Sequence, residues 1–165
     1  MRQIVSQQNR AGALRLTTAL LLVAVSACGG GGRGDSPQVS DARIGQPTGP
    51  NAALYFTADG YGEDDQLVGA ATDVAPKVEI HETVMGDNGT MGMQPVESLD
   101  LPASGQLVLE PGGYHVMLVG VDRLDVGAKV KVTLDWKNAG EQTIEAEVVE
   151  PSETMDDMGD MGDEG

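Results

Sequence analysis

Two histidines and four methionines stand close together in the sequence and are the residues best suited to metal chemistry. They are His81, Met85, Met91, Met93, His115 and Met117. Thioether sulfur is a soft, neutral ligand that prefers a soft cation such as Cu(I), and imidazole binds several late first-row metals. Mg²⁺ and Ca²⁺ prefer oxygen ligands, and structural zinc sites usually contain cysteine. The residue types therefore favour copper(I), although a methionine taken singly more often fills a core gap than binds a metal.

The cysteine content excludes one kind of copper protein. Cys28 is the only cysteine, so a disulfide within one molecule is impossible. A blue-copper electron-transfer centre requires a cysteine ligand, and Cys28 lies at the end of an export signal. With both histidines assigned to a candidate metal site, no histidine remains as the general base that a hydrolytic nucleophile needs. We therefore expect a protein that is not an enzyme.

Residues 1–27 have the composition of a secretory signal peptide. Arg2, Arg10 and Arg15 form a basic start, and an apolar stretch follows at residues 16–27 that is too short for a permanent membrane span. The sequence Val-Ser-Ala-Cys at its end resembles the bacterial lipobox, in which the cysteine is lipidated and becomes the mature N-terminus. We expect an exported protein that acyl chains such as palmitate on Cys28 anchor to the cell membrane, facing the periplasm or the cell exterior. A free thiol beside an ordinary cleavage site is the alternative.

The mature chain is strongly acidic. The whole sequence has 10 Lys and Arg against 26 Asp and Glu, and the signal removes three arginines and no acid, which leaves a net charge of −19. Such a field disfavours nucleic acid as a partner and favours metal ions or cationic partners. A solubilising role for the acidic residues is equally compatible with this composition.

Two segments lack the periodicity of a folded core. Residues 28–50 are rich in Gly, Ser and Pro, and we expect a flexible linker. Residues 151–165 are acidic, and we expect them to be disordered. This tail carries a methionine at every third position, so its sulfurs and those of the turn-rich segment after His81 are candidate auxiliary metal ligands. The auxiliary set is Met85, Met91, Met155, Met158 and Met161. A spectator role for the first two and a merely solubilising tail are the alternatives.

Residues 51–150 alternate between apolar and polar side chains, which is typical of half-buried strands. Val130, Val132, Leu134 and Trp136 fall on one face of the clearest example. Turn signals such as Pro111-Gly112-Gly113 separate seven candidate strands, so we predict an all-β Greek-key sandwich or barrel. The predicted strands are 52–58, 66–74, 77–84, 106–110, 114–119, 129–136 and 143–149.

The strand at 114–119 presents two of the candidate ligands together. Residues i and i+2 of a strand share a face, so His115 and Met117 lie on one side. Tyr114, Val116 and Leu118 lie on the other side, where they can fill the core. We therefore expect His115 and Met117 to point outward or toward a rim of the domain.

The spacing of four of these residues resembles the motif of the PCuAC copper chaperone family. Met93 follows His81 by twelve positions, His115 follows by twenty-two more, and Met117 by two more. The segments VEIHE, MGMQPV and PGGYHVMLVG around these residues are also similar, and the resemblance covers residues 51–150. Glu82 stands where the family has an optional methionine, which leaves an auxiliary ligand there in doubt.

The resemblance implies a fold, a site and a partner. It implies a cupredoxin-like β-barrel with a surface-exposed Cu(I) site at His81, Met93, His115 and Met117. It further implies a monomeric carrier that delivers copper to an acceptor protein, in particular the copper centre of cytochrome oxidase or its assembly factors. Two alternatives stay open: a buffering or resistance lipoprotein that sequesters copper with the same ligands, and an envelope interaction module whose methionines only pack.

We predict that Cys28 is acylated in the mature protein. Several acyl chains anchor a protein stably, whereas one chain binds a membrane only marginally. Mass spectrometry of the membrane fraction should show an acylated N-terminal cysteine, and Cys28→Ala should abolish this species. A soluble, unmodified mature protein would contradict the lipobox interpretation.

Overall fold

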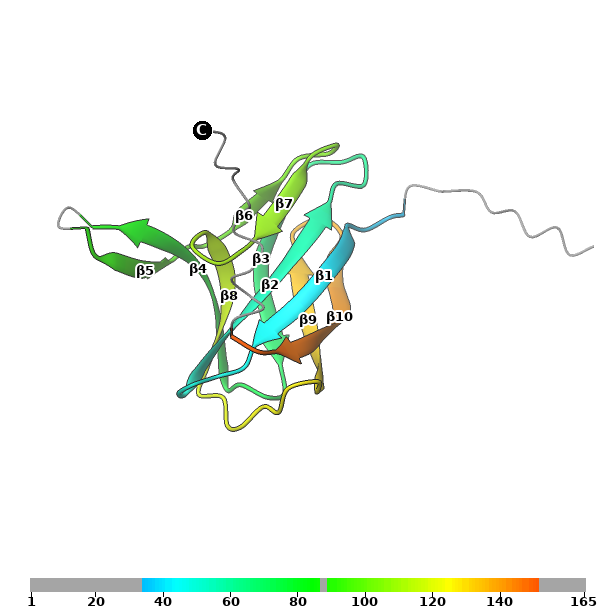
Figure 1. The fold of residues 1–165 in the computed structure, drawn as a ribbon. Helices are drawn as coiled ribbons and strands as arrows, with labels where there is room; N and C mark the ends of the chain where they lie inside the picture. Colours follow the sequence, from blue (N-terminus) through cyan, green and yellow to red (C-terminus); the bar gives the residue numbers. More distant parts are fainter. Residues whose placement is uncertain (1–33, 87–88, 152–165) are drawn as a thin grey trace, which may run out of the picture. The chain divides into compact units, whose positions relative to one another are not determined.

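The computed structural model describes residues 34–86 and 89–151, and its regular structure is β-strand. Among these residues no helix has the length and apolar character that a membrane span requires. The predicted all-β class is confirmed, and each of the seven predicted strands corresponds to a strand of the structure (Figure 1). The described residues form ten strands: β1 (Gln38–Gly45), β2 (Asn51–Asp59), β3 (Asp65–Thr72), β4 (Lys77–Met85), β5 (Met91–Pro95), β6 (Leu99–Leu101), β7 (Gln106–Leu109), β8 (Tyr114–Val119), β9 (Lys129–Trp136) and β10 (Gly140–Val149).

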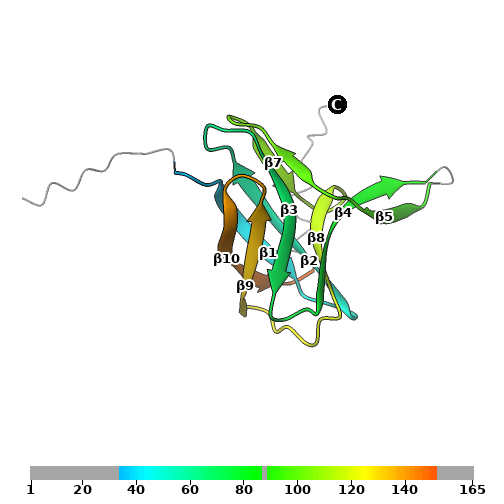
Figure 2. The ribbon, with the colours of Figure 1, turned by 180° about the vertical axis from the view of Figure 1, so that it is seen from behind.

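The strands form one curled sheet in the order β5-β4-β8-β2-β1-β10-β9-β3-β6, with β7 also paired to β2. The β1–β10 pair is parallel, and the other pairs are antiparallel (Figure 2). Among the described strands, no hydrogen-bonded pair joins the two ends of this order. Residues of β3 and β4, which are far apart in the order, nevertheless line a common groove, because the sheet curls around its core.

The core follows from the alternation of apolar residues. In β9 all four of Val130, Val132, Leu134 and Trp136 are buried, as the sequence predicted. The single tryptophan donates a hydrogen bond from its Nε1 to Gln142 Oε1 at 3.0 Å, so its burial leaves no polar atom unsatisfied. Because the apolar residues occupy the inner face, the alternate residues of each strand lie on the outer face.

The boundary expected for the linker is wrong. Residues 38–45 were expected to belong to the flexible segment 28–50, but they form β1, which lies between β2 and β10. The register of β1 shifts between Ser40 and Arg43, and Asp41 has a φ of 54°. This bulge adds a residue, so the inward Val39, Ala42 and Ile44 do not follow the strict period of two that predicts a strand.

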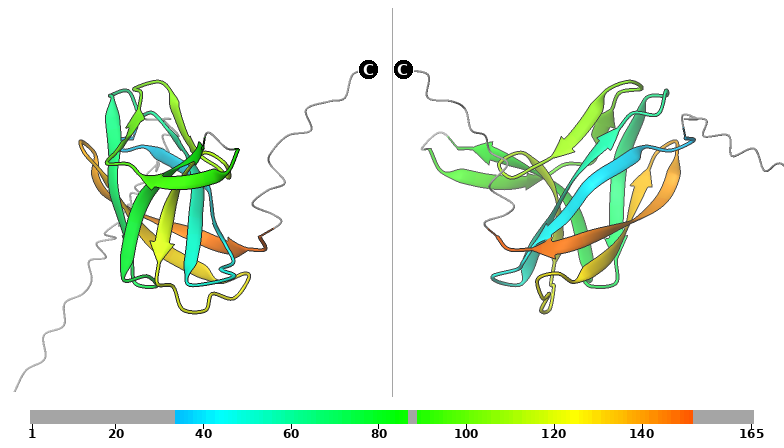
Figure 3. Two further views of the ribbon diagram at one scale, coloured as in Figure 1. Left: turned by 90° about the vertical axis from the view of Figure 1, so that its left-hand side faces the viewer. Right: turned by 45° about the vertical axis from the view of Figure 1, so that its right-hand side comes forward.

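Two other strands were also missed, for different reasons. All five residues of β5 are exposed, so β5 shows no apolar alternation. It pairs only with the outer half of β4, and the resulting β4–β5 hairpin projects from the body of the sheet (Figures 1 and 3). β6 has only three residues, although Leu99 and Leu101 are buried. Its alternation is too short to be distinguished from a loop.

Asp65 joins two connections at one end of the sheet. Its buried carboxylate accepts hydrogen bonds from the backbone N–H groups of Gln66, Asn138 and Ala139 at 2.7, 2.9 and 3.0 Å, and from the Tyr61 hydroxyl at 2.9 Å. Burial acts to raise the pKa of Asp65, but these hydrogen bonds together lower it below its ordinary value. The anionic carboxylate therefore stabilises the folded state.

We predict that Asp65→Asn lowers the free energy of unfolding by about 2–3 kcal/mol, because an amide cannot accept from all four donors and leaves buried groups unsatisfied. Since the folded pKa is depressed, the contribution of Asp65 is present above the unfolded pKa and is lost as pH falls through the folded pKa. Urea unfolding at neutral and acidic pH should show this loss in the wild type and not in Asp65→Asn. The exposed Asp135→Asn is the matched control, and equal stability of the two variants would contradict the account.

Candidate metal centre

His81 and His115 face each other across two neighbouring strands. They are direct partners in the β4–β8 register, and their ring centroids lie 5.7 Å apart with planes at 63°. The preceding residue of β4, Ile80, and the residue after His115, Val116, are buried in the core. Because adjacent residues of a strand point to opposite faces, both imidazoles lie on the outer face of the sheet, where the β4–β5 hairpin begins.

His115 is buried and His81 is half-buried, although both lie on the outer face. His115 is only 2% exposed. The expectation that it lies on the outer face is therefore correct, but the expectation of a site exposed at the surface is wrong for this residue. The Tyr55 ring, on β2, lies 6.2 Å from the His115 ring. Pro111 and Gly112 line the same small pocket as His115. The burial of His115 was not predictable from the sequence, because the residues that cover it belong to a neighbouring strand and to a turn.

Three imidazole nitrogens are buried and have no hydrogen-bond partner among the residues that the structure describes. They are Nδ1 and Nε2 of His81 and Nε2 of His115. His81 Nε2 lies 3.5 Å from Glu79 Oε2, at the limit of a polar contact, and His115 Nδ1 lies 3.4 Å from the Gly113 carbonyl oxygen. A buried polar atom without a partner costs about 1–3 kcal/mol. A metal ion bound to these nitrogens would offset that cost.

The surroundings of His115 favour its neutral form. Burial lowers the pKa of His115 and the neighbouring His81 lowers it further, while the Gly113 carbonyl acts in the opposite direction. A metal ligand must offer a free nitrogen lone pair, so a lowered pKa favours binding at neutral pH. A hydrogen bond from Lys77 Nζ, at 2.8 Å, lowers the pKa of Glu79 despite the opposing effect of desolvation. An anionic carboxylate thus lies beside His81.

The hairpin brings methionines to the same face as the histidines. Met93 is the register partner of Thr83, two residues beyond His81, and Met91 is the partner of Met85. Met91 and Met93 line a pocket of about 200 Å³ together with His115 and Tyr55. Sulfur and imidazole donors therefore meet in one place, although the β5 methionines are separated from His115 by more than twenty positions of sequence.

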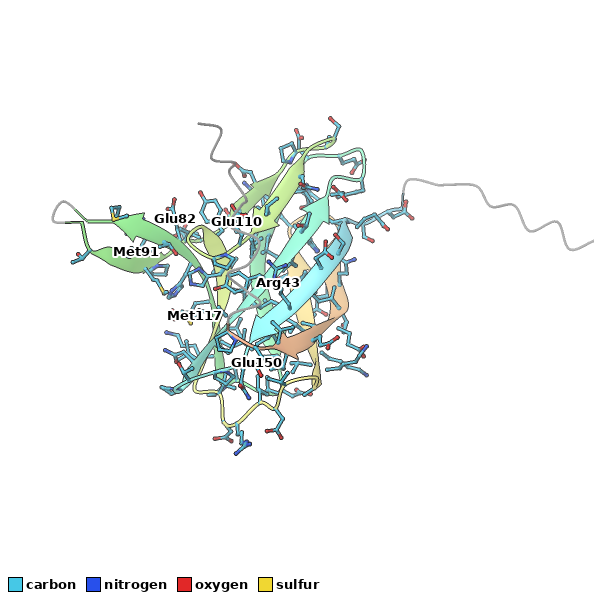
Figure 4. All side chains as sticks on the ribbon, in the orientation of Figure 1. Arg43, Glu82, Met91, Glu110, Met117 and Glu150 are labelled. Carbon is cyan, nitrogen blue, oxygen red and sulfur yellow. The ribbon has the colours of Figure 1, made fainter. Side chains whose placement is uncertain are left out.

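Met117 lies on the other side of the histidine pair. It follows His115 by two residues on β8, is half-buried, and faces Glu79 of β4 and Ala53 of β2. Figure 4 shows Met117 on the body of the sheet and Met91 out on the projecting hairpin. The histidines thus lie between a half-buried methionine and exposed ones.

Among the other candidates of the sequence, only Met85 belongs to the described residues. Met85 is 69% exposed near the tip of the hairpin and does not line the pocket. Cys28 and the tail residues Met155, Met158 and Met161 lie outside the described residues.

The structure adds Arg43, Tyr55 and Glu79, which the sequence analysis did not single out, to the surroundings of the histidine pair. The register of β1, β2, β8 and β4 places Arg43, Tyr55, His115 and His81 in one row across the outer face. Burial raises the pKa of Tyr55, whereas the positive charge of Arg43 opposes that rise. Tyr55 stands between the core residues Leu54 and Phe56, so its outward direction was predictable. The proximity of Tyr55 to His115 was not predictable, because it depends on the order of the strands in the sheet. The proximity of Glu79 to Met117 was not predictable for the same reason.

The donor set restricts which metal fits. Within residues 34–86 and 89–151, no group of three or more His, Cys, Asp or Glu side chains is arranged to hold a metal ion. The further donors near the histidine pair include the thioether sulfur of Met93, which lines the pocket with His115, and that of Met117 on the same face of β8. Mixed imidazole and thioether coordination suits Cu(I) and not the hard cations.

Comparisons with known proteins agree with this fold. A family model described as "Putative lipoprotein LpqE-like" matches residues 37–148. The "Putative lipoprotein Lxx21020" of Leifsonia xyli subsp. xyli is 34% identical over 128 residues, which cover 76% of each chain.

Solved structures of PCuAC domains are also similar. The copper-bound PCuAC domain from PmoF2 matches with a TM-score of 0.59 and 25% identity, over 70% of this chain and 93% of that one. The Cu(I) form of DR1885 from Deinococcus radiodurans matches with a TM-score of 0.54 and 34% identity, over 66% and 75%. The resemblance to PCuAC domains is thereby confirmed, and with it the cupredoxin-like fold. The chain belongs to the LpqE-like family, and its β-domain has the fold of a PCuAC domain.

Proposed function

We propose that this protein is an extracytoplasmic copper carrier that binds one Cu(I) through His81, Met93, His115 and Met117. The observation that supports this most strongly is the cross-strand histidine pair, in which three buried ring nitrogens have no hydrogen-bond partner among the described residues and which lies on the same face as the methionines. Two relatives of the same fold are copper-bound in their solved forms, which supports the choice of metal.

The exposure of the ligands suits a carrier. His115 is buried, His81 is half-buried and both lie on paired strands, whereas Met93 is 60% exposed on the hairpin. A partner can approach the sulfur side first and exchange ligands one at a time, without access to the histidines. A site that only sequesters copper gains nothing from exposed ligands, and we therefore favour delivery.

The partner that we propose is a copper-accepting protein of the same membrane surface. Acylation of Cys28 would hold the carrier at the membrane, where cytochrome oxidase or its assembly factors would receive the ion for the dinuclear copper centre. Neutral thioether donors suit this transfer because they stabilise Cu(I) without adding an anionic ligand.

We predict that the double variant His115→Asn/Met117→Leu binds Cu(I) more than about 100-fold more weakly, since changes merely around a metal's ligands already cost 10–100-fold. Anaerobic titration of the mature protein against a competing Cu(I) chelator measures the affinity. Because His115 is buried, circular dichroism and thermal unfolding should verify the fold. The exposed Met93→Leu, which tests a third ligand, carries little risk of unfolding.

Met161→Leu is the matched control, because it removes one thioether that does not belong to the proposed site. This variant should bind the first Cu(I) with the affinity of the wild type. Wild-type affinity in His115→Asn/Met117→Leu would show that the ligands are wrongly assigned.

We also predict that the affinity for Cu(I) changes little between pH 8 and 7 and falls at acidic pH. Protons compete with the metal for the imidazole nitrogen, and an ordinary histidine has a pKa of about 6.5. Burial lowers the pKa of His115, so competition at this ligand begins at a lower pH than for an exposed histidine. Chelator competition at several pH values tests this. Affinity that stays constant down to pH 5 would indicate a site made of methionines alone.

A further inference from the structure

Three methionines continue outward from the histidine pair along one face of the β4–β5 hairpin. Met93, Met91 and Met85 are 60%, 65% and 69% exposed, and they are the three most exposed large hydrophobic residues in the described part of the chain. Each step toward the tip of the hairpin thus brings a thioether further from His115 and further into solvent.

Packing does not explain these methionines. Every residue of β5 is exposed, and none of the three belongs to the core or to the side chains packed against it. Exposed apolar groups gathered on one face are typical of an interaction site. A hairpin that needed only to extend from the sheet could use polar residues at these positions.

The register places Met85 and Met91 directly opposite each other. The Cβ atoms of such a pair lie about 4.5–5.5 Å apart, and the three rotatable bonds of each methionine let both sulfurs turn toward one point. Met91 also lines the pocket that contains Met93 and His115. It therefore lies between the tip of the hairpin and the proposed ligand set.

We propose that Met85 and Met91 form a second, weaker site for a soft monovalent cation, at which Cu(I) enters or leaves the protein. Two thioethers are enough to hold Cu(I) transiently, and Met91 can pass it to Met93 without release into water. The role in transfer rests on the proposed function, whereas the binding of a soft cation at the tip does not.

The test is a titration of the mature protein with Ag(I), a soft monovalent ion that does not change oxidation state under these conditions. The methionine methyl groups are labelled with ¹³C and followed by NMR. The first equivalent should shift Met93 and Met117, and the second should shift Met85 and Met91. The variant Met85→Leu/Met91→Leu keeps the apolar surface but removes the sulfurs. It should retain the first step and lose the second.

Transfer supplies an independent readout. Met85→Leu/Met91→Leu should bind the first Cu(I) with wild-type affinity but release it to a competing chelator more slowly, because the ion loses its transient position between Met93 and solvent. The proposal is overturned if the second Ag(I) shifts only the tail methyl groups of Met155, Met158 and Met161, or if the variant keeps both steps.

The His115→Asn/Met117→Leu variant separates this inference from the proposed function. If the tip site is independent, Met85 and Met91 still shift with Ag(I) in this variant. If the wild type shifts Met85 and Met91 but not Met93 and Met117, the proposed ligand set fails and the tip site stands. If Met85 and Met91 do not shift in the wild type, the tip site fails, whatever the histidine pair binds.

Discussion

The antiparallel pairing of β4 with β8 is the constraint on which the candidate site depends. Its register sets Ile80 against Val116 on the core side and, one position along, His81 against His115 on the outer side. A slip of one residue in either strand would turn that strand over, which would move its histidine to the core face and expose its apolar residues. Burial of Ile80, Val116 and Leu118 thus fixes the distance between the imidazoles, and hydrophobic packing does the positioning for a polar site.

The same arrangement separates rigid donors from accessible ones. The histidines belong to strands held on both sides within the sheet, whereas β5 is bonded only to β4. Tyr55 and the turn before β8 cover His115, but the methionines of the hairpin remain open to solvent. A metal held in this way would be fixed on its nitrogen side and exposed on its sulfur side. This asymmetry accords with a protein that must release what it binds.

Much of the fold was predictable because burial on one face imposes a period of two. The predicted core face of β9 is entirely buried, and His115 and Met117 do share the face opposite Val116 and Leu118. The prediction failed where that period is broken or absent. The bulge at Asp41 concealed β1, and β5 has no buried face. The cover over His115 and the row that includes Tyr55 arise from the order of strands that are distant in sequence. Local patterns contain no information on that order.

The four proposed ligands are the positions at which the sequence matches the PCuAC motif, and they lie around one pair of strands and the hairpin that extends from it. The most direct test of the central claim is X-ray absorption spectroscopy at the copper edge on the mature protein loaded with one equivalent of Cu(I). The proposed ligand set predicts a mixed coordination shell that contains both imidazole nitrogen and thioether sulfur. In His115→Asn/Met117→Leu the nitrogen contribution should decrease by that of the one missing imidazole. A shell of sulfur alone, or of nitrogen and oxygen without sulfur, would contradict it.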